Sequence, residues 1–193
     1  TTSDDNNAIQ DLAGNDADDL NDRGVRNLRG FHTYVENTQS TPGRTHQEFR
    51  NNYAFAVLKE DSSVVTWGDD NYGGDSSDVD LSSGVSQIYA TSEAFAALKE
   101  DGSVVSWGDN DYGGDSSDVD LSSDVDQIYS NYGAFAALKE DGSIVTWGRS
   151  RYGGSSGAVE LSSGISQIYS SSFAFAALKD DGSIVTWGSH DYG

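Results

Sequence analysis

The stretch AFAALKEDGSVVSWG at residues 94–108 recurs in three other places along the chain. The copies read AFAVLKEDSSVVTWG at 54–68, AFAALKEDGSIVTWG at 134–148 and AFAALKDDGSIVTWG at 174–188. Their tryptophans are spaced 40 residues apart. A fixed period of this size is typical of repeat architectures, so the repeat is the unit that the fold must explain. We divide the region into the units 46–85, 86–125, 126–165 and 166–193.

Each unit predicts three or four short antiparallel strands. In the second unit, QIYA is a first apolar segment and AFAALK a second one, in which alternate residues face opposite sides. Asp101-Gly102 between two apolar runs predicts a hairpin turn, because glycine adopts a positive φ at low cost. SVVSWG is rich in strand-forming residues and predicts the returning strand. Val119 and Leu121 in DSSDVDLSSDV are consistent with a short fourth strand.

The units together predict an all-β chain of propeller-like blades. A single blade cannot bury both of its faces, so neighbouring units must stack. The Asp-Gly hairpins favour antiparallel blades over an open β-solenoid. Repeated aromatic residues supply large buried areas, while the small alanines let neighbouring blades approach closely. The expected core between blades is formed by Trp67, Trp107, Trp147, Trp187, Phe55, Phe95, Phe135 and Phe175.

The pattern Q-I-Y-S, followed by AFAALK-x-DG-S-[IV]-V-T-WG-x-x-x-YGG, resembles the regulator of chromosome condensation repeat over about residues 46–193. This resemblance implies a β-propeller, and members of the family act as exchange factors for small GTPases or as binding scaffolds. The present units are shorter than the family's, and YGGDSS replaces its longer Gly-Gln-Leu-Gly loop. No position matches an exchange-factor loop, so the resemblance does not carry that activity over to this chain.

Closure of the array has three interpretations. Residues 33–45 have the right length to complete the fourth unit, which would close a small four-bladed ring. Alternatively, the chain is an excerpt of a longer array, or the next subunit completes the ring or a filament. The sequence leaves all three open.

Residues 1–45 predict a polar arm that precedes the repeats. Residues 15–30 predict a short helix, with Asn15 as the N-terminal cap and Gly30 as the terminating residue. Its apolar stripe is narrow, so the helix needs a partner surface on its own propeller or on a neighbouring molecule. We therefore expect the arm either to pack on its own blades or to join copies of the chain.

The overall charge restricts the class of partner. With 32 acidic and 11 basic residues the formal net charge is -21, which disfavours binding to nucleic acid and to anionic membranes. There is no cysteine, so thiolate sites and disulfides are excluded. No apolar run approaches the roughly 20 residues of a membrane-spanning helix, so membrane insertion is not expected.

The loops that follow the first two tryptophans resemble calcium-binding loops. Oxygen-bearing side chains stand at positions 1, 3 and 12 of each loop, with a glycine at position 6. The third unit has Arg149 and Arg151 at the corresponding positions, which excludes calcium there. The candidate calcium ligands are Asp69, Asn71, Asp80, Asp109, Asp111 and Asp120.

The tyrosines of the YG dipeptides are the candidate ligand-binding residues. Tyr72, Tyr112, Tyr152 and Tyr192 would form an aromatic platform for a glycan. Enzymatic activity is not expected, because His32, His46 and His190 recur in no unit. The sequence also contains no phosphate-binding glycine loop of the Walker or Rossmann type.

The sequence therefore predicts a non-enzymatic protein that acts by binding or assembly. The leading hypothesis is a structural or adhesive module of an extracellular filament, surface layer or viral particle, located outside the cell or on its surface. Near-identical units favour it, since repetition serves an array or a multivalent surface. The alternatives are an intracellular protein-binding scaffold and a glycan-binding, lectin-like propeller.

Overall fold

The computed structural model describes residues 50–157 and 159–191. The predicted arm at 1–45, with its helix at 15–30 and its strand at 33–45, lies outside them. The described residues form four antiparallel sheets, as an all-β repeat protein requires. The first sheet pairs β1 (Ala54–Leu58) with β2 (Val64–Gly68). The next three are β3 (Val85–Ala90), β4 (Ala94–Lys99) and β5 (Val104–Gly108); β6 (Val125–Ser130), β7 (Ala134–Lys139) and β8 (Ile144–Gly148); and β9 (Ile165–Ser170), β10 (Ala174–Lys179) and β11 (Ile184–Gly188).

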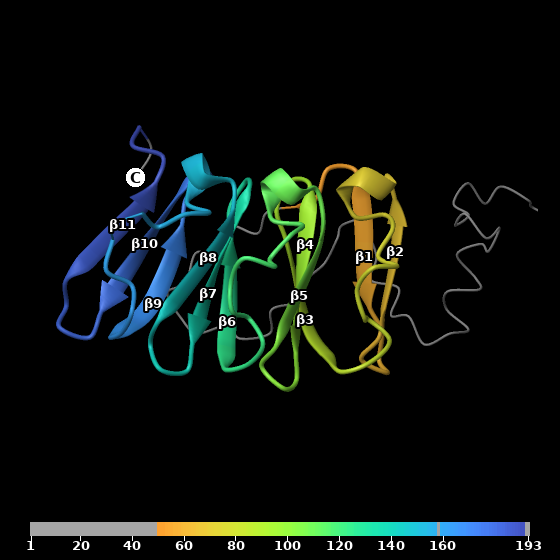
Figure 1. Ribbon diagram of the computed structural model, residues 1–193, viewed down its shortest axis with the longest axis horizontal. Coiled ribbons are helices and arrows are strands. Elements are labelled where there is room, and N and C mark those ends of the chain that lie inside the picture. Colours follow the sequence, from red (N-terminus) through yellow and green to blue (C-terminus); the bar gives the residue numbers. More distant parts are fainter. Residues whose placement is uncertain (1–49, 158, 192–193) are drawn as a thin grey trace, which may run out of the picture.

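The four sheets stand side by side in an open row (Figure 1). β1 and β2 lie at one end of the row, and β10 and β11 lie at the other (Figure 1). Short 3₁₀ turns follow three of the tryptophan strands: η1 (Asp70–Tyr72), η2 (Asn110–Tyr112) and η3 (Ser150–Tyr152). They share one edge of the row, which we call the turn edge, and the hairpins at the opposite ends of the strands form the hairpin edge (Figure 1). The described residues do not close into a ring by themselves.

The stacking of the sheets follows the predicted alternation of AFAALK. In β4, Phe95 and Ala97 pack towards the preceding sheet, with Trp107 beside them. Ala96 and Leu98 pack towards the following sheet. Because Ala96 and Ala97 are fully buried and small, sheets can approach each other closely on both sides. The same arrangement recurs at the next junction, whose core contains Tyr129, Ala134, Ala136, Leu138, Leu161, Ile165, Ile168, Phe175, Ala177 and Trp187.

The predicted Asp-Gly hairpins are confirmed. Leu98 lies opposite Val104, and Gly102 has a φ of 78°. Asp101 Oδ1 accepts hydrogen bonds from Ser103 N at 3.0 Å and from Ser103 Oγ at 2.6 Å. These bonds lower the pKa of the Asp101 carboxyl, so their contribution to stability is lost as the pH falls through that lowered pKa.

Ser62 occupies the position that glycine holds in the other three hairpins, and it has a φ of 61°. A side chain in this left-handed region costs about 1–2 kcal/mol, and glycine avoids that cost. Glycine also has more conformational entropy in the unfolded chain, which offsets part of this gain. We therefore expect Ser62→Gly to stabilise the protein by only about 0.5–1 kcal/mol. Urea denaturation measures the change. The reverse substitution Gly102→Ser should destabilise, since its Cβ would lie 2.9 Å from Asp124 N; equal midpoints for both variants and the parent would contradict this.

The sequence predicts three or four strands per unit, and the structure has three in each of the last three units, without the short fourth strand. The segment 115–124 forms turns, and it joins the edge of β5 through the hydrogen bond from Val104 N to Leu121 O at 2.9 Å. Its aspartates bind their own backbone instead of extending the sheet: Asp115 Oδ1 accepts from Ser117 N, and Asp120 Oδ1 accepts from Ser122 N. Leu121 is nevertheless buried and contributes to the junction between sheets. Each complete blade therefore has three strands and one packed loop.

The first unit departs from the predicted core. Phe95, Phe135 and Phe175 are at most 1% exposed, whereas Phe55 is 40% exposed and Trp67 is half-buried. Phe55 stacks on Trp67 with ring centroids 5.2 Å apart, as the equivalent pairs do in the other units. The difference arises because this face of the first sheet points outward from the row, and no preceding sheet among the described residues covers it.

Candidate binding edge

The YGG sequence fixes the shape of each turn on the turn edge. Gly113 has a φ of 98°, and a Cβ on it would lie 2.7 Å from Phe135 Cδ2 of the next sheet. Its carbonyl oxygen accepts a hydrogen bond from Trp147 Nε1 at 3.1 Å. The same bond joins Trp107 to Gly73 at 3.1 Å and Trp187 to Gly153 at 3.2 Å. The turn of one unit is thus attached to the core of the next.

A buried polar side chain holds each turn through a hydrogen bond to the carbonyl oxygen of the turn's tyrosine. Asn131 is fully buried, and its Nδ2 donates to Tyr152 O at 2.6 Å. Its Oδ1 accepts from Gly133 N at 3.1 Å and from Ala134 N at 2.9 Å. Sequence reasoning missed this residue, although the repeat contained the signal: short polar side chains occupy the equivalent positions 51, 91, 131 and 171.

Four aromatic rings form a continuous row along the turn edge of the last three sheets. The ring centroids of Tyr112 and Tyr132 lie 6.1 Å apart, and those of Tyr132 and Tyr152 lie 5.9 Å apart. Phe173 continues the row at 5.0 Å from Tyr152 and 5.8 Å from Tyr132. All four side chains are half-buried, so each presents part of its ring to solvent. We call these residues the aromatic row.

Arg149 lies within the aromatic row. Its guanidinium carbon stands 5.0 Å from the ring centroid of Tyr112 and 5.6 Å from that of Tyr152. Its Nη1 donates to Tyr112 Oη at 2.6 Å. Gly133 makes room for this arrangement, because a Cβ there would lie 2.9 Å from both tyrosine rings. Contact between a guanidinium and two rings holds the cation in one orientation.

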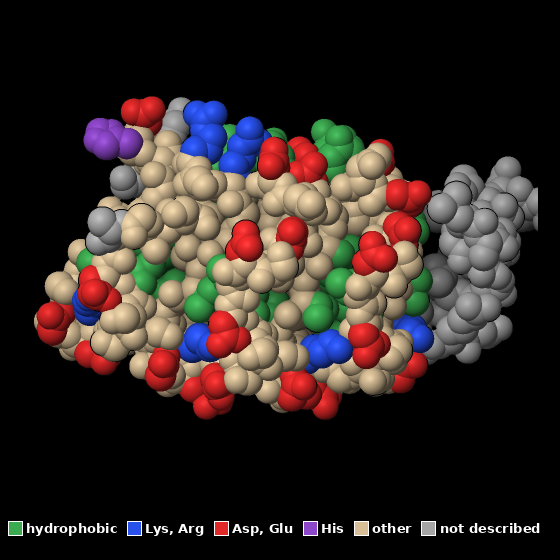
Figure 2. Space-filling view, viewed as in Figure 1, with side chains coloured by type: hydrophobic (Ala, Val, Ile, Leu, Met, Phe, Trp, Pro, Cys, Tyr) green, Lys and Arg blue, Asp and Glu red, His purple; other side chains and the backbone are tan. Residues whose placement is uncertain are grey.

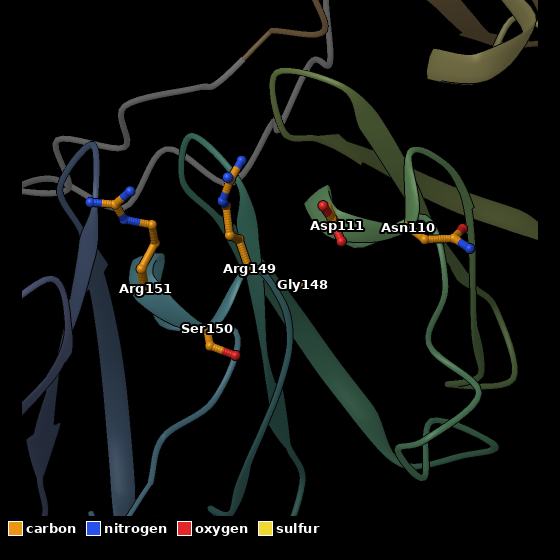
Figure 3. Close-up of a pocket in the computed structure, with 6 residues that line it drawn as sticks. All are labelled: Asn110, Asp111, Gly148, Arg149, Ser150 and Arg151. Atoms are coloured by element: carbon orange, nitrogen blue, oxygen red, sulfur yellow. The ribbon is translucent and has the colours of Figure 1, made fainter.

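A polar hollow of about 380 Å³ lies beside the aromatic row, between η2 and η3. Arg149 and Arg151 extend towards the same side, and Asp111 lies across the hollow from Arg149 (Figure 3). Lys and Arg side chains gather on the upper surface of this acidic molecule, with Asp and Glu side chains beside them (Figure 2). The hollow is lined by Asn110, Asp111, Gly148, Arg149, Ser150 and Arg151.

The charges around Arg149 are coupled. Partial burial raises the pKa of the Glu93 carboxyl, and Asp109 raises it further, whereas Arg149 lowers it. Desolvation raises the pKa of the Tyr112 hydroxyl, to which Glu93 also contributes. Arg149 therefore offsets the repulsion between carboxylates on this part of the turn edge.

The predicted calcium ligands are engaged separately at the two ends of each loop. In the first unit, Asp69 Oδ1 accepts from Asn71 N at 3.0 Å, whereas Asp80 Oδ1 accepts from Ser82 Oγ at 2.7 Å. Asp80 Oδ2 also lies 3.9 Å from Lys99 Nζ. In the second unit, Asp120 Oδ1 likewise accepts from Ser122 Oγ, Asp111 lines the hollow, and Asp109 Oδ1 is buried without a hydrogen-bond partner among the described residues. Within 50–157 and 159–191, no group of three or more His, Asp or Glu side chains is placed to hold a metal ion.

Because Asp80 and Asp120 are bound to serine and face lysine, we expect calcium to contribute nothing to stability. A melting curve in excess EDTA should then coincide with one in millimolar Ca²⁺. A rise in Tm with Ca²⁺ that Asp80→Asn abolishes would show that the loop closes on an ion, contrary to this expectation.

The candidate tyrosines are positioned differently from one another. Tyr112 and Tyr152 belong to the aromatic row, whereas Tyr72 pairs with Tyr53 at 4.4 Å in the first unit. Tyr192 lies outside the described residues, as do His32 and His46. His190 is exposed, and it follows the last strand, β11. In the part of the chain that the structure describes, no helix has the length and apolar character needed to cross a bilayer.

Comparisons with known proteins agree with this architecture. Residues 85–113 match the family described as the regulator of chromosome condensation (RCC1) repeat. No curated protein matches the sequence. Among solved structures, the ectodomain of the receptor kinase CR4 from Physcomitrella patens superimposes with a TM-score of 0.53 at 17% identity, covering 72% of this chain and 39% of its own. Prp20p from Saccharomyces cerevisiae gives a TM-score of 0.52 at 20% identity, covering 72% of this chain and 43% of its own.

The chain thus spans less than half the length of either solved structure, and at these identities the likeness shows the fold alone. The matched segment 85–113 covers the three strands of the second unit and its turn. The other units share its sequence pattern and, where described, its strand register. The second unit is therefore similar to the regulator of chromosome condensation repeat, and the other units repeat its sequence pattern.

Proposed function

We propose that this protein is a non-enzymatic binding scaffold whose stacked sheets present the turn edge to a partner protein. The observation that carries the proposal is the aromatic row with Arg149 held within it. Tyrosine and arginine are the residue types enriched at the centres of protein interfaces, where they supply most of the binding energy. Held against one another and anchored from below by Asn131, these side chains lose little conformational freedom when a partner binds.

The chemistry of the hollow indicates what the partner presents. Arg149 and Arg151 offer several N–H donors, and guanidinium groups bind carboxylates in a paired, planar geometry. An acidic side chain next to an apolar one would place its carboxylate in the hollow and its apolar neighbour on the aromatic row. We therefore propose an acidic, partly apolar peptide segment as the recognised element.

Solved proteins with this fold support a role in protein binding. Yeast Prp20 was solved bound to Kap60, with a TM-score of 0.52 to this chain at 19% identity. Prp20p is also described with its binding properties to Gsp1p and histones. These partners belong to Prp20, and what we transfer as a proposal is the use of the repeat as a binding surface.

Selection from a displayed peptide library against the whole chain tests the proposal. Enriched peptides should contain an acidic residue beside an aromatic or aliphatic one. Their affinity should fall at least tenfold on Arg149→Ala and on Tyr132→Ala, because central interface residues contribute more than about 1.4 kcal/mol each. Lys139→Ala, which removes a cation from the hairpin edge, is the matched control. Peptides that bind all four proteins equally would refute a site at the turn edge.

A structural or adhesive module is the second candidate, and the near-identity of the units favours it, since repetition serves an array or a multivalent surface. In this form the protein would work as one subunit of an extracellular filament, surface layer or viral particle. A glycan would compete for the same aromatic row, since sugars stack on tyrosine rings. A glycan array probed with the parent and with Tyr112→Ala separates that outcome, because a lectin would show a signal that the variant loses.

A further inference from the structure

The turn edge carries charges of opposite sign at the same repeat position of neighbouring units. Position 109 of the second unit is aspartate, and the equivalent position 149 of the third unit is arginine. Asp109 N donates to Glu93 O at 2.9 Å, and Arg149 N donates to Gly133 O at 2.8 Å. The backbone angles also agree, with φ -68° and ψ 124° at Asp109 and φ -69° and ψ 114° at Arg149. The two side chains therefore leave the backbone at matching places, one sheet apart.

The third unit supplies its own cation to a pair of tyrosines, whereas the second unit places carboxylates at the equivalent positions. Arg149 lies over two tyrosine rings because Gly133 leaves space between them. The residue equivalent to Gly133 in the second unit is Glu93. Burial raises the pKa of the Tyr72 hydroxyl and that of the Tyr112 hydroxyl, and the charge of Glu93 raises both further. Glu93 thus lies close to both rings.

The carboxylates of Asp109 and Glu93 lack a matching positive charge. Asp69 accepts a hydrogen bond from its own turn, but Asp109 makes no such bond. Asp109 Oδ1 is buried, and none of the described residues donates to it. Partial burial and then Asp109 raise the pKa of the Glu93 carboxyl, and Arg149 offsets only part of this rise. Both the unpaired acceptor and the repulsion cost free energy, which a cation beside the two carboxylates would offset.

We infer that Glu93 and Asp109 bind a lysine or arginine side chain of the partner, and that this residue belongs to the same segment whose carboxylate enters the hollow. The rings of Tyr72 and Tyr112 flank that cation, as two rings flank Arg149. The inference rests on the proposed function and adds the order of charges along the partner. Its basic residue lies over the junction of the first two sheets, and its acidic residue lies between η2 and η3.

The stacking of the sheets sets the distance between the two charges of the partner. Sheets that pack face to face lie about 10 Å apart. The ring-to-ring steps of 6.1 and 5.9 Å from Tyr112 through Tyr132 to Tyr152 agree with this spacing. In a polyproline II segment, residues i and i+3 lie on the same side and about 9 Å apart, and aromatic surfaces commonly bind this conformation. We therefore expect the basic and the acidic residue of the partner to be three positions apart.

Selection of the displayed peptide library against the parent and against the double variant Glu93→Gln/Asp109→Asn tests the inference. Peptides selected on the parent should carry lysine or arginine three positions from their acidic residue. Peptides selected on the double variant should keep the acidic residue and lose the preference for a basic one. Asp109→Asn removes no bond to the turn, because Asp109 makes none. Circular dichroism checks that the variant is folded.

A double-mutant cycle measures the contact itself. For a peptide selected on the parent, replacement of its basic residue by glutamine should lower the affinity about threefold to fivefold, and so should the change to Glu93→Gln/Asp109→Asn. The two changes together should cost no more than either one, since both remove the same contact. Glu100→Gln/Glu140→Gln removes two exposed carboxylates from the hairpin edge, and this matched control should bind like the parent.

The outcomes separate this inference from the proposed function. Selected peptides that are acidic but not enriched in a basic residue would overturn the inference and leave the proposed function standing. Peptides enriched in neither charge, or no binding peptide at all, would overturn both. A basic residue that contributes as much on Glu93→Gln/Asp109→Asn as on the parent would also overturn the inference, because the cation would then bind elsewhere on the acidic surface.

Discussion

Replacement of Phe135 by alanine is expected to lower the free energy of unfolding by about 3–5 kcal/mol. Phe135 is fully buried, stacks on Trp147 at 5.0 Å between centroids and lies beneath Gly113 of the preceding unit. The substitution therefore leaves a cavity at the junction between the second and third sheets, which rigid strands on both sides cannot fill. Urea denaturation followed by tryptophan fluorescence measures the loss.

Phe55→Ala is the matched control, because the same residue type stands at the same repeat position and 40% of it is exposed. We expect this variant to lose less than half as much stability in dilute solution. Equal losses at the two positions would contradict the claim that sheet-on-sheet packing, rather than strand propensity, stabilises each unit.

The substitution Gly113→Ala is expected to lower the free energy of unfolding by about 2–5 kcal/mol, from backbone strain and overpacking together. Gly113 has a φ of 98°, which penalises any side chain, and the added Cβ would lie 2.7 Å from Phe135 Cδ2. The ring must move or the turn must open, and either change weakens the bond from Trp147 Nε1 to Gly113 O. Thermal and urea denaturation report the effect.

Gly84→Ala separates the two causes. Gly84 has a φ of 70°, but a Cβ there meets nothing within 4 Å. It should cost only the backbone strain of about 1–2 kcal/mol. A loss at Gly113 no larger than that at Gly84 would show that the YGG turn is not packed against the next sheet.

The repeat sequence predicted the elements of the fold that depend on local pattern. Alternation in AFAALK assigned Phe95 and Leu98 to opposite faces, and Asp-Gly placed the hairpin at Gly102. The conservation of YGG between units with different neighbouring charges indicated that this turn is structural. Each of these inferences needs only residue spacing and the conformational freedom of glycine.

The remaining features depend on side chains that compete with strand pairing for backbone hydrogen bonds, or on contacts between units. Val119 and Leu121 have strand-like spacing, but the neighbouring aspartates and serines bond to their own backbone and prevent a fourth strand. Phe55 shares the pattern of Phe95 and still lies on an outer face, because exposure depends on whether a neighbouring sheet is present.

The candidate site lies where the units differ. Tyr132, Gly133 and Arg149 occupy repeat positions that other units fill with different residues. A search for what the units share passes over them, and only the stacking of the sheets brings Arg149 between two tyrosines. Departures from an otherwise strict repeat are thus the signal by which such a site could be found.

Hydrogen exchange in the three identical AFAALK strands tests the central claim that each sheet is stabilised by its neighbours. β4, β7 and β10 share this sequence and the central place in their sheets, so their intrinsic exchange rates match. In dilute solution, residue-resolved exchange by NMR should be slower in β4 and β7, which described sheets cover on both faces, than in β10, which a described sheet covers on one face. Equal protection in all three strands would contradict the account, because it would mean that each sheet is stable without its neighbours.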